Sequence, residues 1–396
     1  MKPLPLSGIA TRITGFTETG PLVLRLMSSN AAGESSGSND AVLIRSPSDY
    51  DDAQRRHFHT FVVIGDLKGV VPNSDRAIEL PSTFNYLAEG DIIRVDLNSH
   101  KVRALFRRSS AHNYFLVTER CNHYCLMCSQ PPRNVDDGWL LDEIAACVSL
   151  IDSPPPSITF TGGEPLLDWQ RFIPLLASVQ AKIPTTKIHV LTNGRFFADP
   201  RVADSWTKLD RANLSVGIPI YASVDSIHDY VVQSVGALDE TIHGILRVKN
   251  SNHHVEIRVV LHAITVPHLE ETCKWIARNL PFVDHVALMG LENTGFVLAN
   301  PNLWIDPVDY RYVLASSVQL LASAGVPVSV YNLPRCVLEP STRPYSVQSI
   351  SDWKNAFLPE CTSCAEKPSC GGFFSSGRPK FSRGIRAFDK ASGALP

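Results

Sequence analysis

The chain has 396 residues, enough for two or three domains of ordinary size or for one α/β barrel with additions. Hydrophobic residues make up 44% of the sequence, which excludes disorder as its general state. The 37 Lys and Arg residues nearly balance the 39 Asp and Glu residues, so the formal charge is −2 and we expect no nucleic-acid partner.

The sequence predicts a cytoplasmic protein without a membrane anchor. It contains no run of 18 apolar residues, and residues 1–6 lack the apolar core of a signal peptide. In the reducing cytoplasm, cysteines are more often free thiols or metal ligands than disulfides. Two of the nine, Cys147 and Cys273, fall in apolar helical patterns, and we expect them in the core.

Residues 1–112 predict a β-rich N-terminal domain. Segments 91–97 and 101–107 have the pattern of two strands around a turn at 98–100. This hairpin carries four arginines, for which we expect either a solvated strand face or a surface for an acidic peptide segment. They are Arg94, Arg103, Arg107 and Arg108.

From residue 113 onward, short apolar runs alternate with helical periodicity. Strands are expected at 114–118, 157–160, 187–191, 214–220, 255–262 and 283–289, and helices between them. One helix is expected to begin near Asp137, a plausible cap. Six strands in alternation with helices predict an α/β fold with a parallel sheet wound as a partial (β/α)6 barrel, over 113–300. A last helix is expected at 307–323, in a C-terminal domain that covers 301–396.

Three cysteines lie close together after the first barrel strand. Cys121, Cys125 and Cys128 form the spacing C-x3-C-x2-C in a loop at the end of the strand where barrel active sites lie. Three thiolates suit three irons of a [4Fe–4S] cluster and leave the fourth iron open to a small molecule. A structural zinc site and three ordinary thiols are the alternatives, although His123 is awkwardly spaced to complete a zinc site.

Two further motifs end the next two strands. The second strand ends in Thr-Gly-Gly-Glu-Pro at 161–165, where glycines allow close backbone approach to a ligand and exposed carbonyls accept from an ammonium group. The third ends in Leu-Thr-Asn-Gly at 191–194, with a hydroxyl and an amide at the same rim. Three motifs in this order at consecutive strand ends are unlikely to be accidental.

With these motifs the chain resembles the radical S-adenosylmethionine (radical SAM) enzymes over about residues 113–300. Cys121, Cys125 and Cys128 match the superfamily's cluster motif, with Met127 where an aromatic residue is common, and 162–165 match its methionine-binding motif. The resemblance implies a [4Fe–4S] cluster on the three catalytic cysteines and bound SAM. Reductive cleavage of SAM then gives a 5′-deoxyadenosyl radical, which removes a hydrogen atom from the substrate.

The resemblance also implies SAM contacts at the strand ends. We expect the residues after the second strand to meet the methionine ammonium, with those after the third strand at the next strand end. Residues after the fourth strand should reach the ribose, Arg258 should pair with the carboxylate, and the end of the sixth strand should flank adenine. The expected contacts are Gly162, Gly163, Glu164, Thr192, Asn193, Ser223, Asp225, Arg258, Met289 and Gly290.

A narrower resemblance extends over the whole chain. Segments 118–132, 349–354 and 370–374 resemble the His-Xaa-Ser system radical SAM maturase of the HxsC type. This implies a role in maturing a ribosomally made His-Xaa-Ser-type precursor peptide, together with a second radical SAM protein of the same system. An electron donor such as flavodoxin or ferredoxin is the third implied partner.

The remaining cysteines lie near the C-terminus. Cys361, Cys364 and Cys370 form C-x2-C-x5-C followed by two glycines, with Cys336 upstream. The run resembles the auxiliary-cluster tail of radical SAM peptide maturases, a twitch or SPASM-like domain, and its four thiolates suffice for one auxiliary [4Fe–4S] cluster. A zinc ion bound by four sulfurs is the alternative.

Other functions stay open beside peptide maturation. One is a radical SAM enzyme that acts on a small metabolite or nucleotide. Another is a non-catalytic protein, either a zinc or Fe–S binding module or a partner-recognition subunit. Iron and sulfide analysis separates the catalytic from the zinc-binding class, because a zinc module contains no inorganic sulfide.

Overall fold

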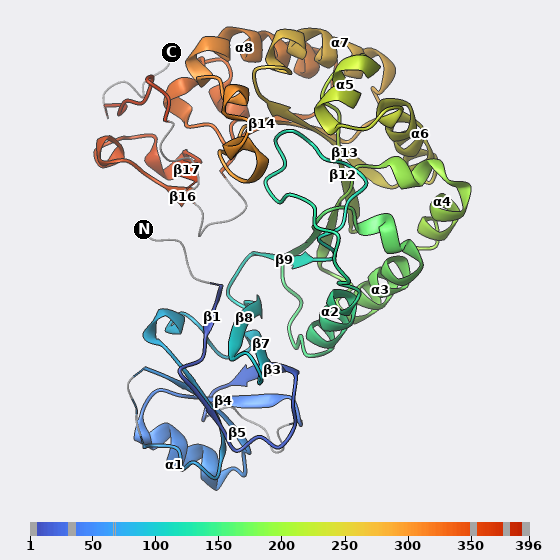
Figure 1. The fold of residues 1–396 in the computed structure, drawn as a ribbon. Helices are drawn as coiled ribbons and strands as arrows, with labels where there is room; N and C mark the ends of the chain where they lie inside the picture. Colours follow the sequence, from blue (N-terminus) through green and yellow to red (C-terminus); the bar gives the residue numbers. More distant parts are fainter. Residues whose placement is uncertain are drawn as a thin grey trace.

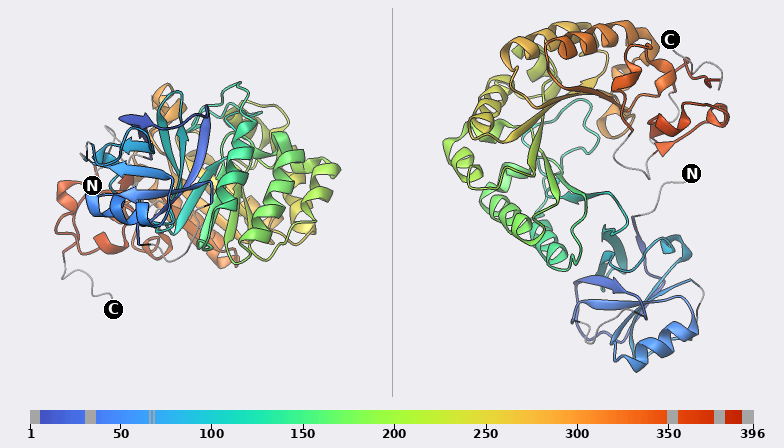
Figure 2. Two further views of the ribbon diagram at one scale, coloured as in Figure 1. Left: turned by 90° about the horizontal axis from the view of Figure 1, so that it is seen from below. Right: turned by 180° about the vertical axis from the view of Figure 1, so that it is seen from behind.

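The structure is a computed structural model that describes residues 6–30, 37–65, 67, 69–348, 355–374 and 381–389. Figure 1 shows three parts in chain order: a small β domain, a half-open barrel with its helices on the outside, and a C-terminal segment of short elements. Two further views in Figure 2 show the N-terminal domain beside one end of the barrel sheet and the C-terminal segment beside the other.

The N-terminal domain contains one helix and a single eight-stranded sheet, ordered β1-β8-β7-β3-β4-β5-β6-β2. Only two residues separate β1 from β2, although they lie at opposite ends of this order, so the sheet must curl back on itself. One apolar cluster lies inside the curl and a second lies under α1. The elements are β1 (Ser7–Ile9), β2 (Arg12–Thr14), β3 (Pro21–Met27), β4 (Asp40–Ile44), α1 (Pro47–Arg55), β5 (Thr60–Ile64), β6 (Arg76–Leu80), β7 (Ile92–Asp96) and β8 (Lys101–Phe106).

The predicted hairpin is confirmed as β7 and β8, which pair antiparallel. Its arginines, however, have partners within the folded chain. Those partners are Glu143 for Arg94 and Arg103, Asp152 for Arg108, and the ring of Tyr86 for Arg107. Glu143 and Asp152 belong to the barrel's first helix and its following turn, so most of this positive charge joins the N-terminal sheet to the barrel. The arginines therefore form neither a solvated strand face nor a surface for an acidic peptide segment.

The barrel sheet contains seven parallel strands, ordered from β15 to β9 in reverse chain order. Buried Val, Ile and Leu residues on one face of each strand pack against the helices in one core. The strands are β9 (His112–Leu116), β10 (Ser157–Thr161), β11 (Lys187–Leu191), β12 (Leu214–Pro219), β13 (His254–Leu261), β14 (His285–Gly290) and β15 (Val328–Tyr331). The helices are α2 (Trp139–Ser149), α3 (Trp169–Lys182), α4 (Pro200–Trp206), α5 (Asp225–Val232), α6 (Ala237–Asn250), α7 (Leu269–Asn279) and α8 (Pro307–Ser323).

The six predicted strands and their alternation with helices are confirmed, but β15 adds a seventh. Helix α8 packs on α7, and β15 pairs parallel with β14, so the sheet continues past residue 300, where the sequence placed a domain boundary. The four-residue strand β15 is too short for a clear alternating pattern. Cys147 and Cys273 are buried in the core as expected. The three domain ranges themselves stay a prediction.

Short helices and a small hairpin complete the chain. The hairpin pairs β16 (Asn355–Ala356) with β17 (Phe373–Phe374). The resembling segment 349–354 lies outside the described residues. The 3-10 helices are η1 (Ser82–Phe84), η2 (Pro165–Asp168), η3 (Arg195–Ala198), η4 (Val266–His268), η5 (Gly295–Leu298), η6 (Pro301–Leu303), η7 (Arg335–Val337), η8 (Arg343–Tyr345), η10 (Pro359–Cys361) and η11 (Lys367–Ser369). In the described part of the chain, every helix is too short or too polar to cross a membrane.

Candidate active site

The three-cysteine loop connects β9 to α2 and reaches across the ends of the next strands (Figure 1). Backbone hydrogen bonds join it to distant segments: Leu126 N donates to Val231 O at the end of α5, at 2.9 Å, and Phe296 N in η5 donates to Cys128 O, also at 2.9 Å. Contacts on both sides therefore fix the backbone that carries the cysteines.

The beginning of this loop is organised by Asp137. Its buried carboxylate accepts from the Thr118 hydroxyl at 2.9 Å, from Glu119 N at 2.6 Å and from Arg120 Nε at 3.0 Å. The sequence predicted Asp137 as a helix cap, but α2 has Gly138 at its N-cap position and no side-chain cap. Asp137 therefore holds the two ends of the cysteine loop together.

The two glycines after β10 lie directly against this loop. A Cβ atom on Gly162 would stand 2.3 Å from Thr118 O, and one on Gly163 would stand 2.0 Å from Arg120 O. Gly163 N donates to Thr118 O at 2.8 Å, and Glu164 N donates to Arg120 O at 2.9 Å. The close approach that requires glycine here is thus an approach of backbone to backbone.

Glu164 connects this strand end to the next one. Its carboxylate is fully buried and accepts from Thr192 Oγ1 at 2.7 Å, Asn193 N at 2.7 Å and Leu166 N at 2.9 Å. Burial raises its pKa to about 7, although these hydrogen bonds oppose the rise. Asn193 Nδ2 then donates to Asn122 Oδ1 in the cysteine loop at 2.6 Å. The motifs after β9, β10 and β11 therefore form one connected unit.

The three thiols are partly or largely buried beside one another. Burial, and then the charge of Glu164, raises the pKa of Cys121 to about 12, and burial also raises the pKa of Cys125 and Cys128. The charge of Cys128 would also raise the pKa of Cys121 and Cys125, and the charge of Cys121 that of Cys125. A bound cation reverses this balance, because it stabilises thiolates that otherwise repel one another.

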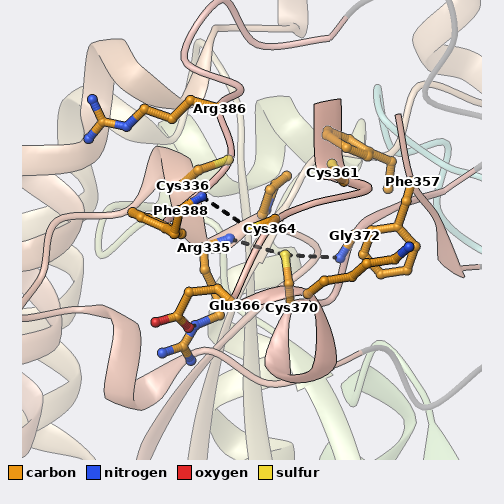
Figure 3. A pocket seen from close by; sticks show the side chains of 13 residues that line it. Arg335, Cys336, Phe357, Cys361, Cys364, Glu366, Cys370, Gly372, Arg386 and Phe388 are labelled. Atoms are coloured by element: carbon orange, nitrogen blue, oxygen red, sulfur yellow. Dashed lines mark hydrogen bonds and ion pairs between the residues drawn. The ribbon is translucent and has the colours of Figure 1, made fainter. Parts of the chain in front are cut away.

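The four C-terminal cysteines line a pocket of about 310 Å³, which is separate from the cysteine loop of the barrel (Figure 3). Backbone N–H groups point at two of the sulfurs. Arg335 N and Gly372 N each lie 3.4 Å from Cys370 Sγ, and Phe388 N lies 3.3 Å from Cys364 Sγ. Such donors stabilise sulfur that carries negative charge. Across the described ranges, no three His, Cys, Asp or Glu side chains already converge as the ligands of one metal ion.

Residues 115–276 match the Radical SAM superfamily. The chain contains a radical SAM domain. Membership in this superfamily implies a [4Fe–4S] cluster and SAM. The donor set fits that cluster, because three half-buried cysteines lie on one fixed loop at the strand ends. Comparison with curated proteins gives no match.

Solved structures of similar fold include Streptococcus suis SuiB bound to S-adenosylmethionine, with 12% identity and a TM-score of 0.46 over 56% of this chain and 51% of that one. SuiB bound to its precursor peptide SuiA gives 12% and 0.45, over 57% and 49%. A radical SAM methyltransferase from Sphaerobacter thermophilus gives 16% and 0.40, over 61% and 72%. The chain thus spans about half the length of SuiB.

Within the radical SAM domain, the expected SAM contacts fall into two groups. Gly162, Gly163, Glu164, Thr192 and Asn193 lie together at the cysteine loop. However, both oxygens of the Glu164 carboxylate and the hydroxyl of Thr192 already bond to the chain, so these two side chains organise the rim. A contact between SAM and Glu164 or Thr192 stays a prediction, and it would be made by their backbone atoms.

The second group lies farther along the sheet. Arg258 and Met289 touch on the inner face, with Arg258 Nη2 3.1 Å from Met289 Sδ. Tyr221 packs in one cluster with Met127 and Cys125 of the cysteine loop, and burial raises its pKa well above the ordinary value. Three expected contacts lie at the rim itself: Ser223 is half-buried and Asp225 exposed after β12, and Gly290 ends β14 against Leu333.

Sequence reasoning missed two residues that hold the site together, Asp137 and Asn122. Asp137 precedes a helix, where an acidic residue ordinarily indicates a cap. Asn122 lies between two cysteines and has no motif of its own. Their roles depend on contacts between distant segments, which no local pattern reveals.

Proposed function

We propose that the chain is a radical SAM enzyme that modifies a ribosomally made peptide of the His-Xaa-Ser type. The observation that carries the catalytic part is the joined unit of the cysteine loop and the ends of β10 and β11. Cys121, Cys125 and Cys128 would hold the cluster, and the backbone at 162–164 would bind the methionine ammonium. When SAM is bound and reduced there, it supplies a 5′-deoxyadenosyl radical.

The inner face of the sheet would position the rest of SAM. Arg258 would pair with its carboxylate, Ser223 and Asp225 would meet the ribose, and Met289 with Gly290 would flank adenine. The chain's own part is to orient SAM and the substrate and to exclude water, because a reactive radical tolerates no loosely held partner.

The C-terminal pocket would hold one auxiliary [4Fe–4S] cluster. Its four cysteines supply one thiolate per iron, and backbone N–H groups at Cys364 and Cys370 would stabilise the cluster's charge. A zinc ion on the same sulfurs is the alternative. The proposed domains are a β-rich part at 1–112, the barrel at 113–300 and the auxiliary domain at 301–396.

The peptide assignment rests on the sequence resemblance to the HxsC type. It implies a second radical SAM protein of the same system and a flavodoxin or ferredoxin as electron donor, in the cytoplasm. A small metabolite or nucleotide is the alternative substrate.

The test is anaerobic incubation of the reconstituted chain with SAM, a reductant and the His-Xaa-Ser-type precursor peptide, followed by mass spectrometry of the peptide. We expect a mass change that requires SAM and the three cysteines of the loop. Formation of 5′-deoxyadenosine with an unchanged peptide would refute the substrate and retain the chemistry. Zinc without inorganic sulfide would refute both.

A further inference from the structure

The inner face of the barrel sheet carries charged and polar side chains away from the helices. On β13, Val255, Ile257 and Val259 are buried, whereas Glu256 and Arg258 point to the opposite face. Their side chains are 18% and 23% exposed. Figures 1 and 2 show the helices of the barrel on the outer side of the sheet, so this inner face is the side that lies away from them.

Five of these side chains lie next to one another on β11 to β15. Ser329 Oγ lies 2.9 Å from His285 Nε2, and His285 Nδ1 lies 2.9 Å from Glu256 Oε2. On the other side, His189 Nε2 lies 3.7 Å from Glu256 Oε1, and His189 Nδ1 lies 2.8 Å from Ser215 Oγ. We call Ser329, His285, Glu256, His189 and Ser215 the inner-face relay.

The Ser329 half of the relay has the geometry of a base held by a carboxylate. A carboxylate that accepts at Nδ1 keeps the proton on that nitrogen and leaves the lone pair of Nε2 directed at the serine hydroxyl. Burial by itself would raise the pKa of Glu256, but the hydrogen bond from His285 and the charge of Arg258 lower it to about 2. Glu256 is therefore ionised at neutral pH, with one carboxylate oxygen against His285 Nδ1.

The other groups around His285 complete this environment. Arg258 donates to Glu256 Oε1 at 3.1 Å, and the ring of Tyr331 packs edge-on against His285. Burial lowers the pKa of His189 to about 4, so this imidazole is neutral at pH 7. The groups around His285 at neutral pH are therefore one anion, Glu256, and one permanent cation, Arg258. The remaining neighbours are neutral.

The half-buried Ser329 end of the relay lies a short way below the rim formed by the strand ends. Ser329 is two residues before the end of β15, about 7 Å below the rim at the rise of a strand. Arg258 extends toward the same rim through its contact with Met289, the second-last residue of β14. A substrate segment inside the half-barrel can therefore touch the rim and the relay together.

We propose that Ser329, His285 and Glu256 accept a proton from an O–H, N–H or S–H group of the substrate. The step rests on the proposed function. The substrate proton passes to Ser329 Oγ while the Ser329 proton moves to His285 Nε2. Glu256 holds the resulting imidazolium, and the bonding pair stays on the substrate atom. That atom becomes the stronger nucleophile toward the reaction centre.

The activity test uses the reconstituted full chain and the His-Xaa-Ser-type precursor peptide, with product and 5′-deoxyadenosine measured separately from pH 6 to 9. For His285→Gln we expect a fall of at least about 100-fold in peptide product, the usual effect of a lost general base. Formation of 5′-deoxyadenosine without peptide should stay within about threefold of the parent protein. Ser329→Ala and Glu256→Gln should lose product in the same way.

The matched control is His112→Gln. His112 forms a similar pair with Ser157, at 2.6 Å on β9 and β10, and its ring nitrogen has this serine as partner instead of the glutamate of the relay. The control should keep full product and the parent pH profile, whereas His285→Gln should lose the acid limb of that profile. Equal losses in both variants, or product within about threefold in His285→Gln, would overturn the proposal.

A second readout does not depend on the substrate. In the full chain with 15N-labelled histidine, NMR should show His285 as the Nδ1–H tautomer, with a downfield N–H signal that Glu256→Gln shifts upfield. An Nε2–H tautomer would overturn the relay whatever the substrate is. If the parent protein cleaves SAM but leaves the peptide unchanged, the proposed substrate fails and this tautomer decides the relay.

Discussion

Gly163→Ala tests the contact between β10 and the cysteine loop. The added Cβ would stand 2.0 Å from Arg120 O and 3.1 Å from Cys121 Cβ, and real Cβ atoms essentially never approach within 3.0 Å. The Arg120 carbonyl must therefore retreat by at least 1.0 Å, the difference between these two distances. That shift breaks or weakens the hydrogen bonds at Gly163 N and Glu164 N.

The expected cost follows from these changes. Overpacking typically costs about 1–3 kcal/mol, and each of the two weakened hydrogen bonds adds about 1 kcal/mol, so we expect a loss of about 3–5 kcal/mol in the free energy of unfolding. The same displacement moves Cys121, and misplacement of about 1 Å reduces catalytic rates by about 100-fold. Formation of 5′-deoxyadenosine from SAM should fall by about that factor.

The assay compares urea unfolding, iron content and 5′-deoxyadenosine formation in Gly163→Ala and the parent protein. Gly37→Ala is the matched control, because the nearest atom to its added Cβ lies 3.8 Å away. It should change none of the three measurements. A Gly163→Ala protein with parental stability and turnover within twofold would refute the close backbone contact.

Three further predictions concern the tail, the domain interface and pH. Cys361→Ala with Cys364→Ala should remove about four irons per chain but spare SAM cleavage without peptide; loss of one zinc at unchanged iron would contradict this. Glu143→Ala should cost about 2–3 kcal/mol and expose the link between the β-rich part and the barrel to proteolysis, because it removes the buried carboxylate that pairs with both Arg94 and Arg103; unchanged cleavage would contradict it. The folded pKa of Glu256 lies below its ordinary 4.5, so its stabilisation is present above pH 4.5 and lost as pH falls toward 2. Glu256→Gln should cost about 2–3 kcal/mol in urea unfolding at pH 7 and much less at pH 3, and equal costs would refute the shift.

The parallel sheet could be predicted because its strands are short segments rich in apolar residues that alternate with helical segments. All six expected strands occur within about three residues of their predicted bounds, as at 187–191, which is β11. The four-residue β15 could not be predicted, because its place in the sheet depends on pairing with β14. The hairpin arginines were misinterpreted for a similar reason, since Glu143, the partner of Arg94 and Arg103, lies 40 residues beyond Arg103 on α2.

The candidate site was predictable as a set of motifs but not as an assembly. Spacing marked Cys121, Cys125 and Cys128, and the structure places them in one loop. The spacing in the sequence did not reveal that the glycines lie against the loop backbone or that Glu164 is buried. These features result from three strand ends meeting at one rim, which is a property of the fold.

SAM cleavage by the reconstituted chain tests the central claim most directly. Under anaerobic conditions with dithionite, the parent protein should form 5′-deoxyadenosine and methionine in equal amounts. The variant with Cys121→Ala, Cys125→Ala and Cys128→Ala should form neither, while it keeps the iron of the C-terminal pocket. A triple variant that still cleaves SAM, or a parent protein that contains iron and sulfide but never cleaves it, would contradict the account.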